Sequence, residues 1–258
     1  MMKDLFNRVA FWNEDNIGVI VIKNQPLNLI DSDTLNQLSS ALTLASSDAS
    51  LKWIMISGAG DKFFSAGIDW ESLGNDYDSI SDLVNAVKTF ASLMITIDKP
   101  VIGVLNGTAA GLGLEIALLT DLLIAPSDVK LCNPEGEIGL PMLLGAPILI
   151  KALPRLRAIQ LISGEAMSAE EAGRLGLIHV VLPRDNLFGD AKSIILKTRI
   201  DKYTRSFIHE DMEHVIKNIN PSLLEPLLSK CHGISKNNLA SKIGEARNKC
   251  LATHPMKQ

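Results

Sequence analysis

The stretch Asn106-Gly107-Thr108-Ala109-Ala110-Gly111-Leu112-Gly113-Leu114-Glu115 joins a glycine-rich turn to an apolar helix. The first N–H groups of a helix have no partner within it and carry partial positive charge. This turn can therefore offer an N–H to a negative oxygen. Glu115 follows in the first helical turn, and Glu135 comes 20 positions later. Because two carboxylates can hold and activate a water, the combination favours chemistry on an activated carbonyl compound.

Short apolar runs alternate with longer amphipathic segments on both sides of this stretch. Strands that are apolar throughout are typical of burial on both faces, and hence of a mostly parallel sheet with helical crossovers. We therefore expect an α/β fold in which Asp31 or Ser32 caps the first long helix. The expected strands are 17–22, 53–56, 101–104, 122–125 and 180–181, and the expected helices are 32–45, 81–97 and 114–119.

Composition excludes several classes of protein. The formal net charge of the 258-residue chain is −4 and there is no long basic run, so we expect no nucleic-acid partner. No apolar run reaches the ~20 residues of a membrane helix, so we expect no membrane partner. Cys132, Cys231 and Cys250 lack metal-ligand spacing. They are interpreted as reduced thiols of a cytoplasmic protein without a metal site.

A second glycine turn, Phe63-Phe64-Ser65-Ala66-Gly67-Ile68-Asp69, follows the second expected strand. Small residues at 65–67 allow a ligand to approach the backbone, and the N–H of Ile68 could point inward unpaired. The alternative is a plain turn capped by Asp69. The turn at 110–113 could instead bind phosphate, although it lacks the dinucleotide-binding spacing. As a pair, the two turns could each give one N–H to the same oxyanion.

Carboxylates occupy three places that matter for function. Glu115 lies in an apolar run, where a charge is costly unless it is paired or working; the alternative is an exposed first-turn glutamate. Glu135 and Glu137 follow Pro134, where solvated loop glutamates are the alternative. Asp121 is expected to be a buried hydrogen-bond acceptor at a helix–strand junction. The five histidines form no ligand pairs and are interpreted as structural or surface residues.

From about residue 17 to residue 183, the chain resembles the crotonase, or enoyl-CoA hydratase/isomerase, superfamily. Five segments carry the resemblance, and together they are highly specific. They are Asn24-Gln25-Pro26-Leu27-Asn28, Lys62 to Asp69, Lys99-Pro100-Val101-Ile102-Gly103-Val104-Leu105-Asn106-Gly107, Pro134-Glu135, and Ser163 to Ala172 with Gly176-Leu177-Ile178.

The resemblance implies a crotonase-like superhelix of ββα turns with a C-terminal helical region. Composition becomes more basic and helix-rich after Asn186, so we expect a core at 1–186 and helices at 187–258. In the family such helices support homotrimers or dimers of trimers, and we expect them also to cover the active site. The implied substrate is an acyl-CoA thioester, with coenzyme A as part of the substrate and no prosthetic group.

The resemblance also assigns roles to individual residues. The thioester oxygen would lie between the N–H groups of Ile68 and Leu112, and Glu115 and Glu135 match both glutamates of the hydratases. Lys62, Ala66 and Ile68 would border the adenine and phosphates of coenzyme A. The substrate-binding set is completed by Pro26, Leu27, Gly67, Asp69 and Gly111.

These matches predict a hydratase that adds water across, or eliminates it to form, the double bond of an enoyl-CoA. Two departures stand out: Leu112 replaces a common glycine, and residues 136–141 replace the usual loop, so Glu137 could be a substitute acid. Trp70 and Leu73 could line the acyl site or belong to the core or a lid. The alternatives are isomerisation, thioester hydrolysis and a binding protein without activity.

Overall fold

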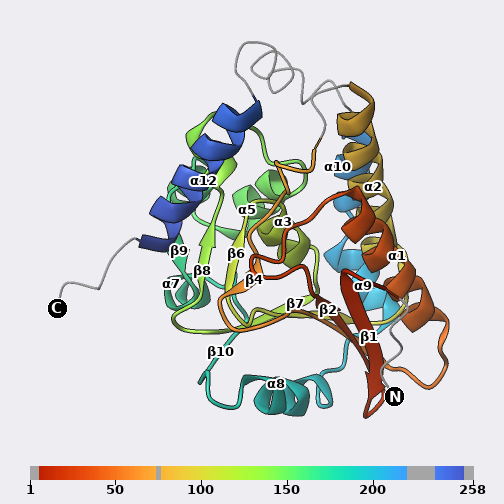
Figure 1. Cartoon of the computed structure of the whole chain (residues 1–258). Helices are drawn as coiled ribbons and strands as arrows, with labels where there is room; N and C mark the ends of the chain where they lie inside the picture. The colour runs from red at the N-terminus through yellow and green to blue at the C-terminus, as the bar shows by residue number, and fades with distance from the viewer. Residues whose placement is uncertain (1–5, 74–76, 220–235, 253–258) are drawn as a thin grey trace.

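Two sheets organise the chain in the computed structural model, which describes residues 6–73, 77–219 and 236–252 (Figure 1). The larger sheet has the strand order β1-β2-β3-β5-β7-β10, and all its neighbours are parallel except the β1–β2 hairpin. Its strands are β1 (Val9–Glu14), β2 (Ile17–Ile22), β3 (Trp53–Gly58), β5 (Val101–Val104), β7 (Leu122–Pro126) and β10 (Val180–Leu182). The expected mostly parallel sheet is confirmed, although β1 was not among the expected strands.

The smaller sheet has the order β4-β6-β8-β9. Its strands are β4 (Phe63–Ser65), β6 (Thr108–Ala110), β8 (Lys130–Cys132) and β9 (Met167–Ser168). Each of β3, β5 and β7 is followed along the chain by a strand of this second sheet and then by a helix. The chain therefore winds as a superhelix of ββα turns, and the expected crotonase-like fold is confirmed.

Helices cover both faces of the larger sheet. On one face, α1 (Ser32–Ser47) and α2 (Tyr77–Thr96) pack over a core that includes Ile20 and Ile22. On the other face, α8 (Leu187–Ile195) packs on Ile17 and Val19 (Figure 1). Side chains alternate between faces along a strand, so β2 has to be apolar throughout. Asp31 caps α1 by accepting a bond from the Thr34 N–H at 2.8 Å, as expected for one of the two candidate caps.

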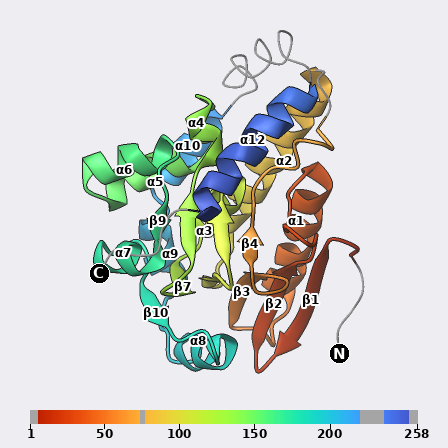
Figure 2. The same cartoon turned by 60° about the vertical axis from the view of Figure 1, so that its left-hand side comes forward.

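The C-terminal region is helical, and its last described helix crosses back over the core. In Figures 1 and 2, α12 (Lys236–Ala252) lies beside the smaller sheet, where it contacts β8 and α4. None of the described helices combines the length and apolar character that crossing a bilayer requires. The other helices are α3 (Leu112–Leu118), α4 (Pro134–Glu137), α5 (Gly145–Ala152), α6 (Arg155–Ile162), α7 (Ala169–Arg174), α9 (Lys202–Ile208) and α10 (Met212–Asn218).

A disulfide joins Cys132 at the end of β8 to Cys250 on α12, with the two Cα atoms 6.4 Å apart. The prediction that these two cysteines are reduced thiols is therefore wrong. The partners are 118 positions apart, and only the return of α12 to the smaller sheet brings them together. Cys231 lies outside the described residues. The correction also removes the cysteines as an argument for a reducing compartment.

A buried charge cluster ties the C-terminal helices to the larger sheet. Asp121 accepts bonds from the Val101 N–H and from Arg205 Nε at 2.6 and 2.7 Å, and its other oxygen lies 2.8 Å from His209 Nε2. Burial would raise the pKa of Asp121, but His209 and Arg205 outweigh it and hold that pKa below its usual value. Asp121 is thus the buried acceptor that was expected at this junction.

We expect Arg205→Met to lower the free energy of unfolding by about 3–5 kcal/mol, because it leaves the Asp121 charge buried without its cation. Arg205 is 1% exposed. Denaturant titration would measure the change. The matched control is Arg155→Met on exposed α6, for which we expect less than about 0.5 kcal/mol. Equal losses in the two variants would contradict this account of the cluster.

Candidate active site

A glycine with positive φ follows each of the strands β4 and β6. Gly67 has φ +91° and Gly111 has φ +52°, a region that favours glycine. The residues that follow are Ile68 and Leu112, and neither donates its N–H to any partner in the described part of the chain. Leu112 is the first residue of α3, so its free N–H also lies at the positive end of a helix. Two unpaired donors thus follow two positive-φ glycines.

The two turns approach each other closely. A Cβ on Gly67 would lie 3.4 Å from the Leu112 nitrogen and 3.4 Å from Glu135 Oε1. A Cβ on Gly111 would lie 2.5 Å from Glu135 Oε2. A Cβ on Gly67 would also lie only 2.9 Å from the carbonyl oxygen of Ala110, so the surroundings of both glycines, as well as their φ angles, disfavour a side chain. The same short distances place the free N–H of Leu112 and the carboxylate of Glu135 around one point.

Glu115 projects from α3 and is held by the start of α5. Its Oε2 accepts bonds from the N–H groups of Leu144 and Gly145, the latter at 2.7 Å. The side chain is buried, so the alternative of an exposed first-turn glutamate is wrong. Burial raises the pKa of Glu115 to about 7, although the two N–H donors oppose the rise. A carboxyl group with this pKa can exchange a proton near neutral pH.

Glu135 is also buried, at 5% exposure, so it is not a solvated loop residue. Its Oε1 accepts a bond from the Trp70 indole N–H at 3.4 Å. Its Oε2 has no hydrogen-bond partner among the described residues. Burial raises the pKa of Glu135, while the charge of Arg247 and the Trp70 bond oppose that rise. An unpartnered buried carboxylate oxygen indicates a working group, since such an atom is costly otherwise.

One small cavity connects these features. Its volume is about 20 Å³, roughly the room that one water needs. Glu115 and Glu135 both line it, together with Ile68 and Leu112. The rest of its wall is mainly apolar and consists of Trp70, Leu73, Leu83, Asn133, Leu140, Pro141 and Leu143. Trp70 and Leu73 line this cavity, and both also belong to or pack against the main hydrophobic core.

The remaining predicted residues lie around the first turn or outside the cavity. Leu27 accepts a bond from the Ala66 N–H at 2.9 Å, which brings the segment that contains Pro26 next to the turn at Gly67. Lys62 and Pro26 are exposed. Asp69 caps the turn after Ile68, accepting from the Ser72 N–H at 3.1 Å.

Glu137 is separate from the two buried glutamates. It does not line their cavity, and its Oε2 pairs with Lys249 Nζ at 2.9 Å. No group of three or more His, Cys, Asp or Glu side chains within the described ranges could hold a metal ion.

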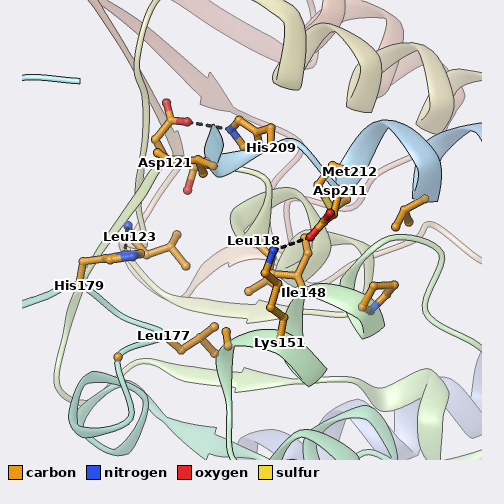
Figure 3. A pocket seen from close by; sticks show the side chains of 16 residues that line it. Leu118, Asp121, Leu123, Ile148, Lys151, Leu177, His179, His209, Asp211 and Met212 are labelled. Atoms are coloured by element: carbon orange, nitrogen blue, oxygen red, sulfur yellow. Dashed lines mark hydrogen bonds and ion pairs between the residues drawn. The ribbon is translucent and has the colours of Figure 1, made fainter. Parts of the chain in front are cut away.

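A second, larger cavity of about 310 Å³ contains none of the predicted site residues (Figure 3). It lies between α3, α5 and α10, where Lys151 and Asp211 pair across it. His179 lines this cavity, and its Nδ1 accepts the Leu123 N–H at 2.9 Å. His209 holds Asp121, as described above. These two histidines are structural, in line with the interpretation from sequence.

Two features of the site were not predicted. The start of α5 holds Glu115, and Pro147 near that start is the available signal, since proline is common in the first helical turn. Arg247 lies on α12 near Glu135, more than 100 positions further along the chain. No local pattern marks it, because its place depends on how α12 returns to the smaller sheet.

The sequence profile of the enoyl-CoA hydratase/isomerase family matches residues 13–226. The chain belongs to this family. A similar protein is the "probable enoyl-CoA hydratase echA8" of Mycobacterium bovis, which is 31% identical over 226 residues, or 86% of each chain. The "crotonyl-CoA hydratase" of Syntrophomonas wolfei is 32% identical over 198 residues, which cover 73% of this chain and 74% of the relative.

Two solved structures show the same fold. A "putative enoyl-CoA hydratase" from Streptomyces avermitilis superposes with a TM-score of 0.76 over 99% of this chain and 95% of that one, at 18% identity. DspI of Pseudomonas aeruginosa gives a TM-score of 0.75 over 88% of this chain and 90% of that one, at 24% identity. The fold extends well beyond the segments that carry the sequence motifs.

We expect Gly111→Ala to displace the carboxylate of Glu135, because the new Cβ would lie 2.5 Å from Oε2. Gly176→Ala is the matched control: Gly176 has φ +83° and open space around its Cβ position. Both variants should lose about 1–3 kcal/mol of stability from the unfavourable φ. Crystal structures of both should show a moved Glu135 only in the first. An unmoved carboxylate there would contradict the close approach.

Proposed function

We propose that this protein is an enoyl-CoA hydratase-type lyase, which adds water to the double bond of an acyl-CoA thioester or removes water to form it. One observation carries the proposal. Two buried glutamates from different helices line a cavity with room for roughly one water, next to two unpaired N–H groups. Water, its base, the proton donor and the carbonyl oxygen would each have a place there.

The N–H groups of Ile68 and Leu112 would bind the thioester oxygen. When water adds to the β carbon, negative charge moves to that oxygen as an enolate. Two unpaired donors that line the cavity would stabilise this charge, and the start of α3 would add its dipole. Only the N–H of residue 112 is needed, so the leucine in place of a common glycine is compatible with this role.

The two carboxyl groups would divide the proton transfers. Glu115, with a pKa of about 7, takes a proton from water as the oxygen attacks the β carbon. Glu135, in its protonated form, gives a proton to the α carbon of the enolate. Elimination of water follows the same path in reverse, with Glu135 as the base and Glu115 as the acid. Glu137 has no part in this scheme, because it pairs with Lys249.

The substrate would enter beside the first glycine turn. We propose that Lys62, Ala66 and Ile68 border the adenine and phosphates of coenzyme A, with Pro26, Leu27, Gly67, Asp69 and Gly111 completing the binding set. Exposed Lys62 suits a phosphate neighbour. Coenzyme A enters as part of the substrate, and the proposed steps use only side chains and backbone N–H groups of the chain itself.

Assembly and location complete the proposal. We propose a homotrimer or a dimer of trimers, supported by large apolar side chains that α6 and α9 leave exposed, such as Leu156 at 69% and Phe207 at 75%. We also propose a cytoplasmic location and no nucleic-acid partner, in keeping with the net charge of −4. The location does not draw on the cysteines, because two of them form the disulfide.

The deciding experiment incubates the purified protein with short-chain, aromatic and cyclic enoyl-CoA and dienoyl-CoA thioesters in 18O-labelled water. We expect mass spectrometry to show the gain of one labelled water with the thioester intact. Glu115→Gln and Glu135→Gln should each lower turnover by about 10²–10⁴-fold while substrate binding is kept. Glu137→Gln is the matched control and should keep its turnover.

Two other products would overturn the proposal. An unchanged mass with a shifted double bond indicates an isomerase, and release of free coenzyme A indicates a thioester hydrolase. Binding without turnover of any thioester in the panel indicates a protein without activity.

Hydration should lose rate on the acid side of neutrality. Glu115 must be ionised to take a proton from water, and its pKa is about 7. We therefore expect kcat/KM to fall about tenfold per pH unit below 7, since that parameter reports groups of the free enzyme. Circular dichroism at each pH would verify that the protein stays folded. A rate that stays level down to pH 5.5 would exclude Glu115 as the base.

A further inference from the structure

The C-terminal helix α12 contacts both β8 and α4. The disulfide joins Cys132 of β8 to Cys250 of α12. Glu135 comes three residues after Cys132, and Arg247 comes three residues before Cys250. Residues three apart share one face of a helix, so Arg247 lies on the same side of α12 as the disulfide. The ion pair between Lys249 and Glu137, at 2.9 Å, is a second link between α12 and α4.

Arg247 is an unusual residue to place at this contact. Its Nε is buried and has no hydrogen-bond partner among the described residues, although a guanidinium group normally finds acceptors. Burial lowers the pKa of Arg247, while the nearby charges of Glu135, Asp69 and Glu71 oppose that effect. Such an environment is costly for a cation, and nearby anionic charge is what offsets the cost.

We propose that Arg247 is a positioning residue of the active site: its cation, placed by a helix that the Cys132–Cys250 disulfide ties to the smaller sheet, favours the ionised form of Glu135. This role rests on the proposed function of Glu135 as the group that exchanges a proton with the α carbon. In the elimination direction Glu135 has to be ionised before it can take the α proton as the base. Burial without a cation would keep the proton on it.

The other charges near Glu135 do not supply this effect. Glu115 on α3 is a carboxyl group, so its charge raises the energy of a second carboxylate close by. Asp69 and Glu71 are anionic as well. Lys249 pairs with Glu137. Of these described charged groups, Arg247 is the cation whose charge lowers the pKa of Glu135.

The test reads the protonation of Glu135 directly and needs no substrate. Protein labelled with carbon-13 at the glutamate carboxyl carbons is titrated by NMR, and Glu135→Gln identifies the resonance. We expect Arg247→Gln to raise the pKa of Glu135 by about one unit, because the lost cation stabilised the carboxylate. Arg247→Lys keeps a charge and should restore most of the wild-type value.

Two kinds of control separate charge placement from damage to the fold. Lys242→Gln removes a positive charge from an exposed position of the same helix and should leave the titration unchanged. Cys250→Ala and Cys132→Ala break the same disulfide and should both raise the pKa of Glu135, by less than Arg247→Gln does. Partial unfolding would lower the intensity of the Glu135 resonance of the folded protein, but it would not move the midpoint of the titration of that resonance.

A functional measurement runs beside the titration. Exchange of the α protons of butyryl-CoA with deuterium requires Glu135 as a base. In Arg247→Gln, the acid limb of the pH profile of this exchange rate should move to higher pH. An unchanged pKa in Arg247→Gln, or an equal shift in Lys242→Gln, overturns the proposal. Unchanged titration in both cysteine variants overturns the part played by the disulfide. A shifted pKa without hydration of any thioester supports the role of Arg247 and overturns only the proposed function.

Discussion

The parallel pairing of β4, β6 and β8 is the constraint on which the site depends. Phe63 pairs with Thr108, and Ala110 pairs with Cys132, so three consecutive turns of the superhelix end side by side. The segments that leave these strands contain the turn at Gly67, the turn at Gly111 and the loop of Glu135. Leu112 and Glu115 share α3, whereas Ile68 and Glu135 belong to the turns before and after it. A slip in either pairing would therefore separate Ile68 or Glu135 from the other groups of the site.

Burial raises the pKa of both glutamates, and different contacts oppose this rise in each of them. The start of α5 gives Glu115 two N–H donors, which hold one oxygen in place. Glu135 has the weaker indole contact and one oxygen without a partner. Environments that differ in this way separate the acid–base properties of two identical side chains, which a reaction with two distinct proton transfers requires.

The parts of the fold that depend on local pattern could be predicted from sequence. The strands β2, β5 and β7 are apolar runs bounded by polar or turn residues. The two glycine turns were identified from their own residues, whereas β4 and β6, the strands directly before them, were not among the expected strands. The strand β1 was missed, although its run Val9-Ala10-Phe11-Trp12 is as long as the apolar run of β7; Phe11 and Trp12 lie half-buried at the edge of the sheet. Local pattern thus works where one segment decides its own conformation.

Contacts between distant segments could not be predicted in the same way. The disulfide joins residues 118 positions apart, and the N–H groups that hold Glu115 come from α5, 30 positions away. These contacts are set by the path of the whole superhelix. The burial of Glu115 itself was left open, because a glutamate in a short apolar helix can lie buried or exposed, and the sequence does not show which face of the helix is packed.

The disulfide closes everything between β8 and the end of α12 into one covalent ring. A helix within such a ring cannot be exchanged with the equivalent helix of another copy while the bond is intact. Exchange of an identical element between copies is otherwise a low-cost route to a dimer. Each copy of this protein therefore keeps its own α12 against its own pair of glutamates, whatever number of copies assemble.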